Sequence, residues 1–177
     1  IEGFYDEYQE DSVSLVDEGY FAGVTASYEH FFQPDWYGAV EIRAARGSTD
    51  YESVSGTIDG ISQWDTETRL LAGYSPPYYQ QGRTKFYAGL GARYFSDELK
   101  GKTSSLGDIG YDRRIFQLYL PIGLTYEFAA YGLTFAPNIE VDKLLWGNVS
   151  SRLGTIPGFT NIENEQTEGY GLRGELM

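Results

Sequence analysis

The chain has no cysteine, one methionine and one histidine among its 177 residues. Without cysteine, neither a disulfide framework nor a thiolate metal site can form. Positive charge is also scarce, because 13 Lys and Arg face 26 Asp and Glu, which gives a net charge of −13. No basic stripe is therefore available to neutralise the phosphates of a nucleic acid, and we expect no nucleic-acid partner.

Long apolar runs are missing as well. No segment approaches the ~20 consecutive apolar residues that a transmembrane helix needs, and none shows a helical period. The sequence has instead 22 Gly and 16 Tyr, a composition that favours β-structure over helical bundles. The length suits a single domain, residues 1–177, with a sizeable core.

Alternation of apolar and polar residues is the main pattern. In "KFYAGLGARY", residues 85–94, the even positions are apolar and end in Phe86 and Tyr94, whereas the odd positions hold Lys85, Arg93 and glycines. The same period of two recurs in residues 20–28, 36–44, 68–74, 116–128, 133–141 and 170–176. It predicts seven strands from residue 19 onward, and "EGFYDEYQED" near the start supplies an eighth with a weaker apolar face.

The connections differ in length at the two ends of the strands. "FFQPD", "PPYYQQG" and "AAYG" are short and rich in turn formers, whereas residues 47–65, 97–113 and 147–166 are long and polar. This alternation predicts a closed, antiparallel, up-and-down barrel of eight strands with two distinct ends. Pro121 and Pro137 fall inside predicted strands and predict bulges there.

Two kinds of barrel share this alternation. A soluble lipocalin-like barrel turns its apolar face inward, and a transmembrane barrel turns it outward to lipid. The aromatic residues favour the second, because they sit at the ends of the apolar faces, where interfacial girdles form. The girdle residues that we predict are Tyr20, Tyr28, Trp36, Tyr74, Phe86, Tyr94, Phe116, Tyr126 and Tyr170.

The other face carries charges of both signs among glycines. In a transmembrane barrel this face would point inward, and its charges would pair and fill the narrow interior. We favour such a filled interior over an open pore. We expect the glycines to leave room for the long side chains, as Gly89 and Gly91 would for Arg93. The predicted interior charges are Glu41, Arg43, Glu67, Arg69, Lys85, Arg93, Glu127, Glu140, Arg173 and Glu175.

At this level of architecture the whole chain resembles the eight-stranded outer-membrane β-barrel proteins of Gram-negative bacteria. The resemblance lies in the aromatic-bounded alternating strands and in the short and long connections, without a subfamily motif. It implies a location in the bacterial outer membrane, contact with lipid and lipopolysaccharide, and a monomer. Basic residues that flank the long connections either solubilise them or meet lipopolysaccharide phosphates; they are Arg46, Lys100, Lys102, Arg113, Arg114 and Arg152.

Three functions compete. The leading hypothesis is a non-enzymatic surface or envelope protein whose long acidic loops bind a host or envelope component. The second is a narrow channel for small solutes, and the third is a lipid A-modifying enzyme. The only histidine, His30, stands beside a short turn with no nucleophile or orienting partner in view, so we expect no catalytic residue, metal or cofactor.

Overall fold

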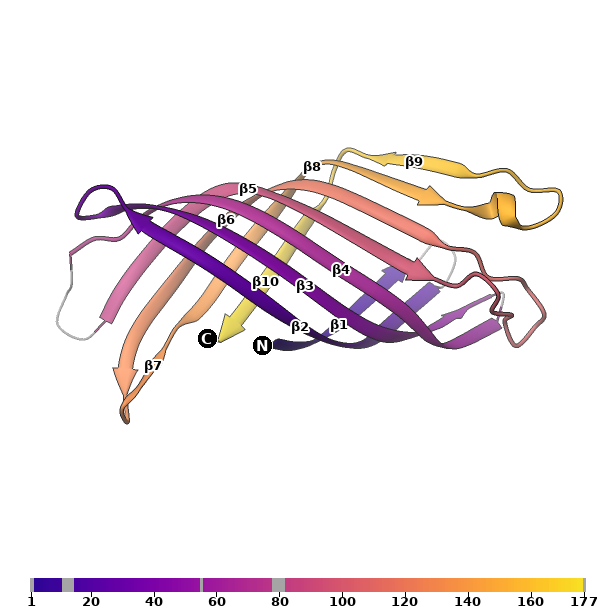
Figure 1. The fold of residues 1–177 in the computed structure, drawn as a ribbon, viewed down its shortest axis with the longest axis horizontal. Coiled ribbons are helices and arrows are strands. Elements are labelled where there is room, and N and C mark those ends of the chain that lie inside the picture. Colours follow the sequence, from indigo (N-terminus) through magenta and orange to yellow (C-terminus); the bar gives the residue numbers. More distant parts are fainter. Residues whose placement is uncertain (1, 11–14, 55, 78–81, 177) are drawn as a thin grey trace.

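The computed structural model describes residues 2–10, 15–54, 56–77 and 82–176 and consists almost entirely of β-strands (Figure 1). The elements are β1 (Glu2–Glu10), β2 (Leu15–Phe31), β3 (Trp36–Ser53), β4 (Gly56–Tyr74), β5 (Gly82–Glu98), β6 (Arg113–Ala130), β7 (Leu133–Phe135), β8 (Pro137–Ser151), the short 3-10 helix η2 (Leu153–Thr155), β9 (Ile162–Gln166) and β10 (Tyr170–Leu176). Within the residues described, no helical segment combines the length and the apolar character needed to span a bilayer.

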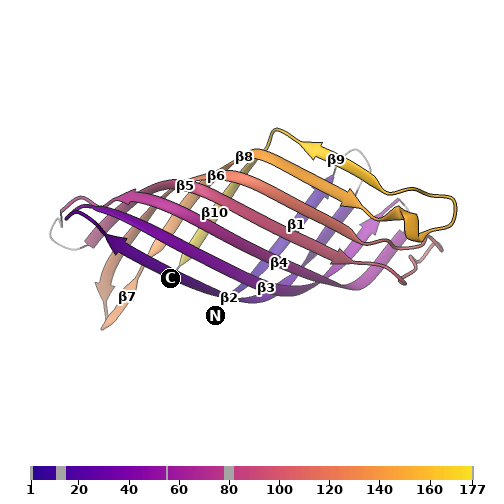
Figure 2. The ribbon, with the colours of Figure 1, turned by 45° about the horizontal axis from the view of Figure 1, so that its top comes forward.

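The strands form one antiparallel sheet, which confirms the predicted all-β class. Eight strands follow one another in the order β1-β2-β3-β4-β5-β6-β8-β10, while β7 pairs with β6 and β9 with β8. The sheet is not closed, because no pairing joins β1 to β10 in the described part of the chain and these strands form its edges. The sheet is nevertheless strongly curved, and the start of β1 and the end of β10 lie near each other in both ribbon views (Figures 1 and 2).

The two ends of the sheet differ in their connections. The short turns after β2 and β6 lie at the left in Figure 1, and the long connection between β5 and β6 lies at the right. Residues 78–81 of the "PPYYQQG" segment lie outside the described residues. The short and long connections thus separate to opposite ends, as the sequence predicts.

Two of the predicted long loops are largely strand, so those predictions are wrong in extent. β3 continues to Ser53 and β4 resumes at Gly56, which makes residues 47–65 most of a long hairpin. β8 likewise continues to Ser151 and pairs with β9. The cause is that polar residues in these segments keep the alternation of faces, with Gln63 and Asp65 buried and Trp64 exposed between them.

The apolar face of the sheet is the exposed one. Val40, Ile42 and Leu70 lie open on the outside of the curved sheet, and Leu90 of β5 is 46% exposed. On the opposite face Glu67 is 4% and Glu140 is 1% exposed. The concave interior therefore holds the buried charges, with a smaller set of apolar side chains that includes Leu71 and Ile61, and the convex surface is largely apolar. This is the reverse of the usual arrangement in a water-soluble domain.

Tyrosine rings fill the space over interior glycines. Tyr119 lies against Gly91 of the neighbouring strand, its partner in the register, so that a Cβ atom at Gly91 would overlap the ring. Tyr37 covers Gly73 and Tyr87 covers Gly123 in the same way. The expectation that Gly89 and Gly91 make room for Arg93 is thus wrong. Tyr119 occupies the place of a side chain at Gly91, and the backbone of β4 lies against Gly89.

Neither predicted proline bulge occurs. Pro121 keeps the register of β6 with β8, and on the β5 side the pairing is interrupted at Leu120 and Pro121 without a shift. A proline lacks the N–H that the ladder needs, so the strand loses local pairing there rather than gaining a residue. Pro137 begins β8 after a break at Ala136. A register shift does occur between Leu118 and Tyr119, opposite β8.

We expect Gly91→Leu to lower the free energy of unfolding by roughly 1–3 kcal/mol, because the new side chain and Tyr119 compete for one space. Gly174→Leu is the matched control, since no atom lies within 4 Å of a Cβ atom built at Gly174. Its effect should stay within about 0.5 kcal/mol. Denaturant unfolding of both variants in detergent checks this, and equal stabilities would contradict the packing of Tyr119 over Gly91.

Candidate functional site

Two buried glutamates organise the interior. Glu67 of β4 accepts hydrogen bonds from Arg173 at 2.7 and 3.1 Å and from the Tyr119 hydroxyl at 2.5 Å. Glu140 of β8 accepts two hydrogen bonds from Arg69, at 2.7 and 2.8 Å, and one from the Tyr87 hydroxyl at 2.7 Å. The Arg173–Glu67 contact is bidentate, through both outer nitrogens of the guanidinium, whereas a single nitrogen of Arg69 bridges both oxygens of Glu140. Hydrogen bonds between charged groups are stronger than neutral ones, so both carboxylates are well compensated.

These contacts join strands that are not neighbours. Arg69 and Glu140 lie on β4 and β8, three places apart in the sheet, and Glu67 and Arg173 lie on β4 and β10, four places apart. In a flat sheet these strands would be about 14 and 19 Å apart, at about 4.8 Å per strand. Direct contact across those intervals requires that the sheet wrap around the charged side chains.

The remaining arginines extend this group, and we call the whole of it the interior network. Arg43 hydrogen-bonds to Asp65 at 2.5 Å and lies 3.5 Å from Glu67. Arg69 also contacts Glu41. The interior network comprises Glu41, Arg43, Asp65, Glu67, Arg69, Arg93, Glu140, Asp142, Arg173 and Glu175.

The structure does not bring all ten predicted interior charges into one group. Lys85 lies near the short-turn end, 2.9 Å from both Glu29 and Glu127, and no ion pair between described residues joins these three to the interior network. Glu175 reaches the network only loosely, 3.9 Å from Arg173. Charge alone therefore gave the correct face for these residues but not their grouping.

Several residues of the interior escaped the sequence prediction. Asp65 and Asp97 were assigned to polar loops, although Asp65 pairs with Arg43 and Asp97 with Arg113. Tyr87 and Tyr119 share the parity of the charged face and are buried, but the predicted interior set contains charged residues only. Asp65 is two residues from Glu67 on β4, so the alternation of faces puts both side chains on the inward face. Extending that alternation toward the start of the strand would have identified Asp65.

The outer face carries the nine predicted girdle aromatics, all of them exposed. Trp36, Tyr74 and Phe86 are successive register partners across β3, β4 and β5, and Tyr94 pairs with Phe116 across β5 and β6. These two rows are eight residues apart along β5. At about 3.3 Å per residue and a tilt near 40°, they are separated by about 20 Å along the axis of the sheet.

A second row of outward residues lies two positions beyond the Tyr94–Phe116 pair, toward the long connections. Arg46, Trp64, Ser96, Arg114 and Ser150 are successive register partners from β3 to β8. The guanidinium carbon of Arg46 lies 5.1 Å from the centre of the Trp64 ring. Two members of this row are arginines, Arg46 on β3 and Arg114 on β6. Both lie on the outward face, next to the apolar surface on the side of the long connections.

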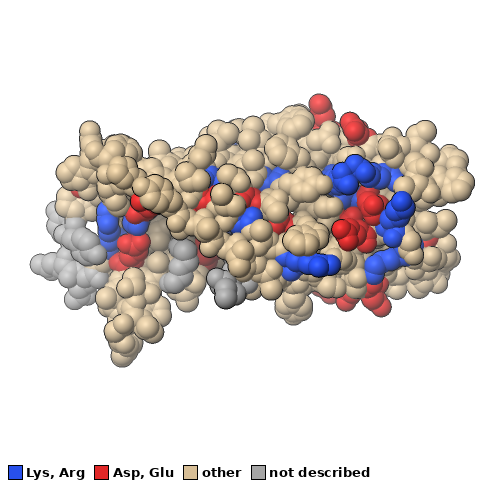
Figure 3. Space-filling view, in the orientation of Figure 1, with Lys and Arg blue, Asp and Glu red and all other residues tan. Residues whose placement is uncertain are grey.

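The other predicted lipopolysaccharide contacts have different surroundings. Arg113 lies 2.8 Å from Asp97, whose side chain is buried, and Lys102 donates hydrogen bonds to the carbonyls of Asp59 and Gly60. Lys100 and Arg152 are exposed near the ends of the long connections. In Figure 3, Lys and Arg side chains gather with Asp and Glu at the right-hand end of the view, where these connections lie in Figure 1.

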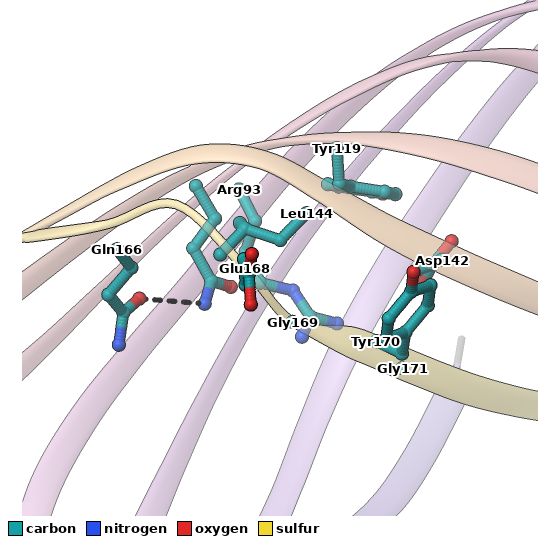
Figure 4. Close-up of a pocket in the computed structure, with 10 residues that line it drawn as sticks. Arg93, Tyr119, Asp142, Leu144, Gln166, Glu168, Gly169, Tyr170 and Gly171 are labelled. Atoms are coloured by element: carbon teal, nitrogen blue, oxygen red, sulfur yellow. Dashed lines mark hydrogen bonds between the residues drawn. The ribbon is translucent and has the colours of Figure 1, made fainter.

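A cavity of about 230 Å³ opens beside the interior network. Arg93, Gln117 and Asp142 are among its lining residues, and Gln117 donates a long hydrogen bond of 3.5 Å to Gln166 (Figure 4). His30 is exposed one residue from the end of β2. Within the described ranges, no group of three or more His, Asp or Glu side chains is placed to hold a metal ion.

Comparison with known proteins found no matching family model, no matching curated protein and no matching solved structure.

Loss of both partners of the Arg69–Glu140 pair should cost less than the two single losses added together. We expect Glu140→Gln to lower the free energy of unfolding by roughly 3–5 kcal/mol, because it leaves Arg69 buried and less compensated. Arg69→Met combined with Glu140→Gln should cost clearly less than the sum of the single changes.

Glu175→Gln is the control for that series. Its carboxylate is only loosely paired with Arg173 and its side chain is 32% exposed, so its effect should stay below about 1 kcal/mol. The measurement is a double-mutant cycle of denaturant unfolding in detergent. Additive single and double changes would mean that Arg69 and Glu140 do not form a compensated pair.

Proposed function

We propose that the chain is a small barrel of the bacterial outer membrane, in which β1 and β10 come together, and that it acts as a non-enzymatic surface or envelope protein. One observation carries this proposal. Valine, leucine and isoleucine cover the convex face, while glutamates and arginines are buried on the concave face. Apolar side chains on the outside gain stability only where the surroundings are as apolar as they are, as in the hydrocarbon core of a bilayer.

The outer surface offers further support for a membrane setting. Its two aromatic rows lie about 20 Å apart, close to the apolar band of about 25 Å in membrane barrels. Tyrosine and tryptophan prefer that boundary because the ring is apolar and the polar tip faces water. Arg46 and Arg114 would then stand at headgroup height, where their guanidinium groups can bind the phosphates of lipid or lipopolysaccharide.

The interior favours an anchor over a channel. Ion pairs from β4, β8 and β10 meet in the interior, and tyrosine rings lie over the neighbouring glycines. A barrel so filled holds its connections in place without conducting. The long β3–β4 hairpin and the 98–113 connection are tied together by Ser105 and Lys102, which bond to the backbone at Thr57, Asp59 and Gly60. We propose that this ordered end contacts the host or envelope component.

A charge on the outer face tests the membrane assignment. Leu90 lies on β5 midway between Phe86 and Tyr94, and Ser96 lies on the same strand and face beyond the aromatic pair. In lipid vesicles, Leu90→Lys should lower the free energy of unfolding by roughly 2–4 kcal/mol, whereas Ser96→Lys should cost about 0–1 kcal/mol.

The same two variants distinguish the soluble alternative. If both lysines change stability by less than about 0.5 kcal/mol, and the protein stays monomeric in buffer without detergent, the face is in water and the membrane proposal fails. Guanidinium unfolding from vesicles, followed by tryptophan fluorescence, gives the required free energies.

Planar bilayer recording separates the anchor from the narrow channel. We expect the purified protein to insert without discrete conductance steps, because the interior network blocks the axis. Glu140→Gln with Arg69→Met, which replaces the central pair by uncharged side chains, should not open a steady conductance either, since the tyrosines remain. Regular steps from the unaltered protein would instead assign it as a channel.

A further inference from the structure

One side of the cavity beside the interior network is lined by an arginine that makes ion pairs but no hydrogen bond with a described residue. Arg93 is the only arginine of the interior network that makes no hydrogen bond with a described residue; Arg43, Arg69 and Arg173 all make at least one. Its Nε atom is buried and lies 3.5 Å from Glu67 and 3.7 Å from Asp65. Figure 4 shows the end of this side chain directed toward the segment that holds Glu168 and Gly169. The two outer nitrogens of the guanidinium are thus available to a ligand.

Two carboxylates line another side of the same cavity: Asp142, which lies 3.8 Å from Arg173, and the exposed Glu168. Asp142 lines the cavity, and its Oδ1 atom is buried and accepts no hydrogen bond from the described residues. Glu168 also lines it and makes neither an ion pair nor a hydrogen bond with a described residue. Buried polar atoms without a partner are rare in folded proteins, and each one calls for an explanation. Here two groups of opposite charge carry such atoms and share one cavity.

Two amides lie beside these charges. Arg93, Gln117, Gly147 and Gln166 are successive register partners across β5, β6, β8 and β9, so their inward sides form a continuous row. Gly147 has no side chain, and the side chain of Gln166 lies over it, with its Oε1 atom 3.0 Å from a Cβ atom built at Gly147. The hydrogen bond that joins Gln117 to Gln166 is long, at 3.5 Å, so either amide can exchange it for a ligand at small cost.

We propose that this cavity binds a small zwitterion, with the ligand's carboxylate on Arg93 and its ammonium group toward Asp142 and Glu168. A ligand with one charge would meet an opposite charge on one side and a like charge on the other, whereas each charge of a zwitterion can lie beside an opposite one. The volume of about 230 Å³ admits a molecule of the size of an amino acid. The amides of Gln117 and Gln166 supply further donors and acceptors. This site is a property of the concave face of the sheet and does not depend on the membrane setting proposed above.

Calorimetric titration of the folded protein with glycine, acetate and methylammonium tests the proposal. Glycine carries both charges, and the other two carry one each. We expect glycine to bind at least about tenfold more tightly than either single-charge probe. Glu168→Gln, at an exposed residue without contacts, should weaken glycine and methylammonium binding about tenfold and leave acetate unchanged. Arg93→Met should weaken glycine and acetate and leave methylammonium unchanged.

Arg152→Gln is the control, because Arg152 is an exposed arginine away from the cavity lining, and it should alter no affinity. The titration is made in whichever medium keeps the protein folded, so a failure of the membrane proposal does not affect it. Failure of glycine to bind would overturn the inference, as would acetate binding as tightly as glycine. Glycine binding that is unchanged in Glu168→Gln would also overturn it, even if Arg93→Met proved too unstable to study.

Discussion

The structure depends on the compensation of two buried carboxylates, Glu67 and Glu140, by arginines from distant strands. An isolated charge in that position would carry a penalty of several kcal/mol, so the arginines must reach it. Arg69 and Arg173 can do so only if β4, β8 and β10 face one another across an enclosed space. The curvature of the sheet follows from this requirement. Because the charges occupy the concave side, the apolar side chains are left with the convex side.

The tyrosine–glycine pairs connect the backbone to these ion pairs. Tyr87 and Tyr119 each lie across a glycine of the adjacent strand and place a hydroxyl on Glu140 and Glu67. A side chain at Gly91 or Gly123 would displace the ring and remove that donor. The glycines therefore act on the carboxylates through the tyrosines, not by making room for arginine. This explains why an interior face with glycine, which weakens an isolated strand, can still be stable.

The sequence predicted what depends on local alternation and missed what depends on strand order. A period of two is a property of each strand, so the class of fold, the two faces and the outward aromatics such as Trp36 and Phe86 could all be read from it. Which arginine meets which carboxylate depends on the curvature and stagger of the whole sheet, which no local window contains. The hairpin at 47–65 was missed because its polar residues resemble a loop until their parity is followed from Glu67 to Asp65. The register shift opposite Leu118 has no sequence signal that we can identify.

The register of the strands links the interior to the outer surface. The outward residues Ala88, Ile122 and Val141 are register partners on β5, β6 and β8. One residue away on each strand lie the inward partners Tyr87, Gly123 and Glu140. A slip by one residue would turn Glu140 outward among apolar side chains and Ile139 inward among charges. Alternation alone does not prevent such a slip, but a tyrosine can lie flat only over a glycine. Each Tyr–Gly pair therefore penalises the shifted pairing sterically, while the ion pairs across the interior penalise it electrostatically. The Tyr–Gly pairs act between β3 and β4 and between β5 and β6, and the ion pairs act between β4 and the strands β8 and β10. Together they hold charge inside and apolar residues outside.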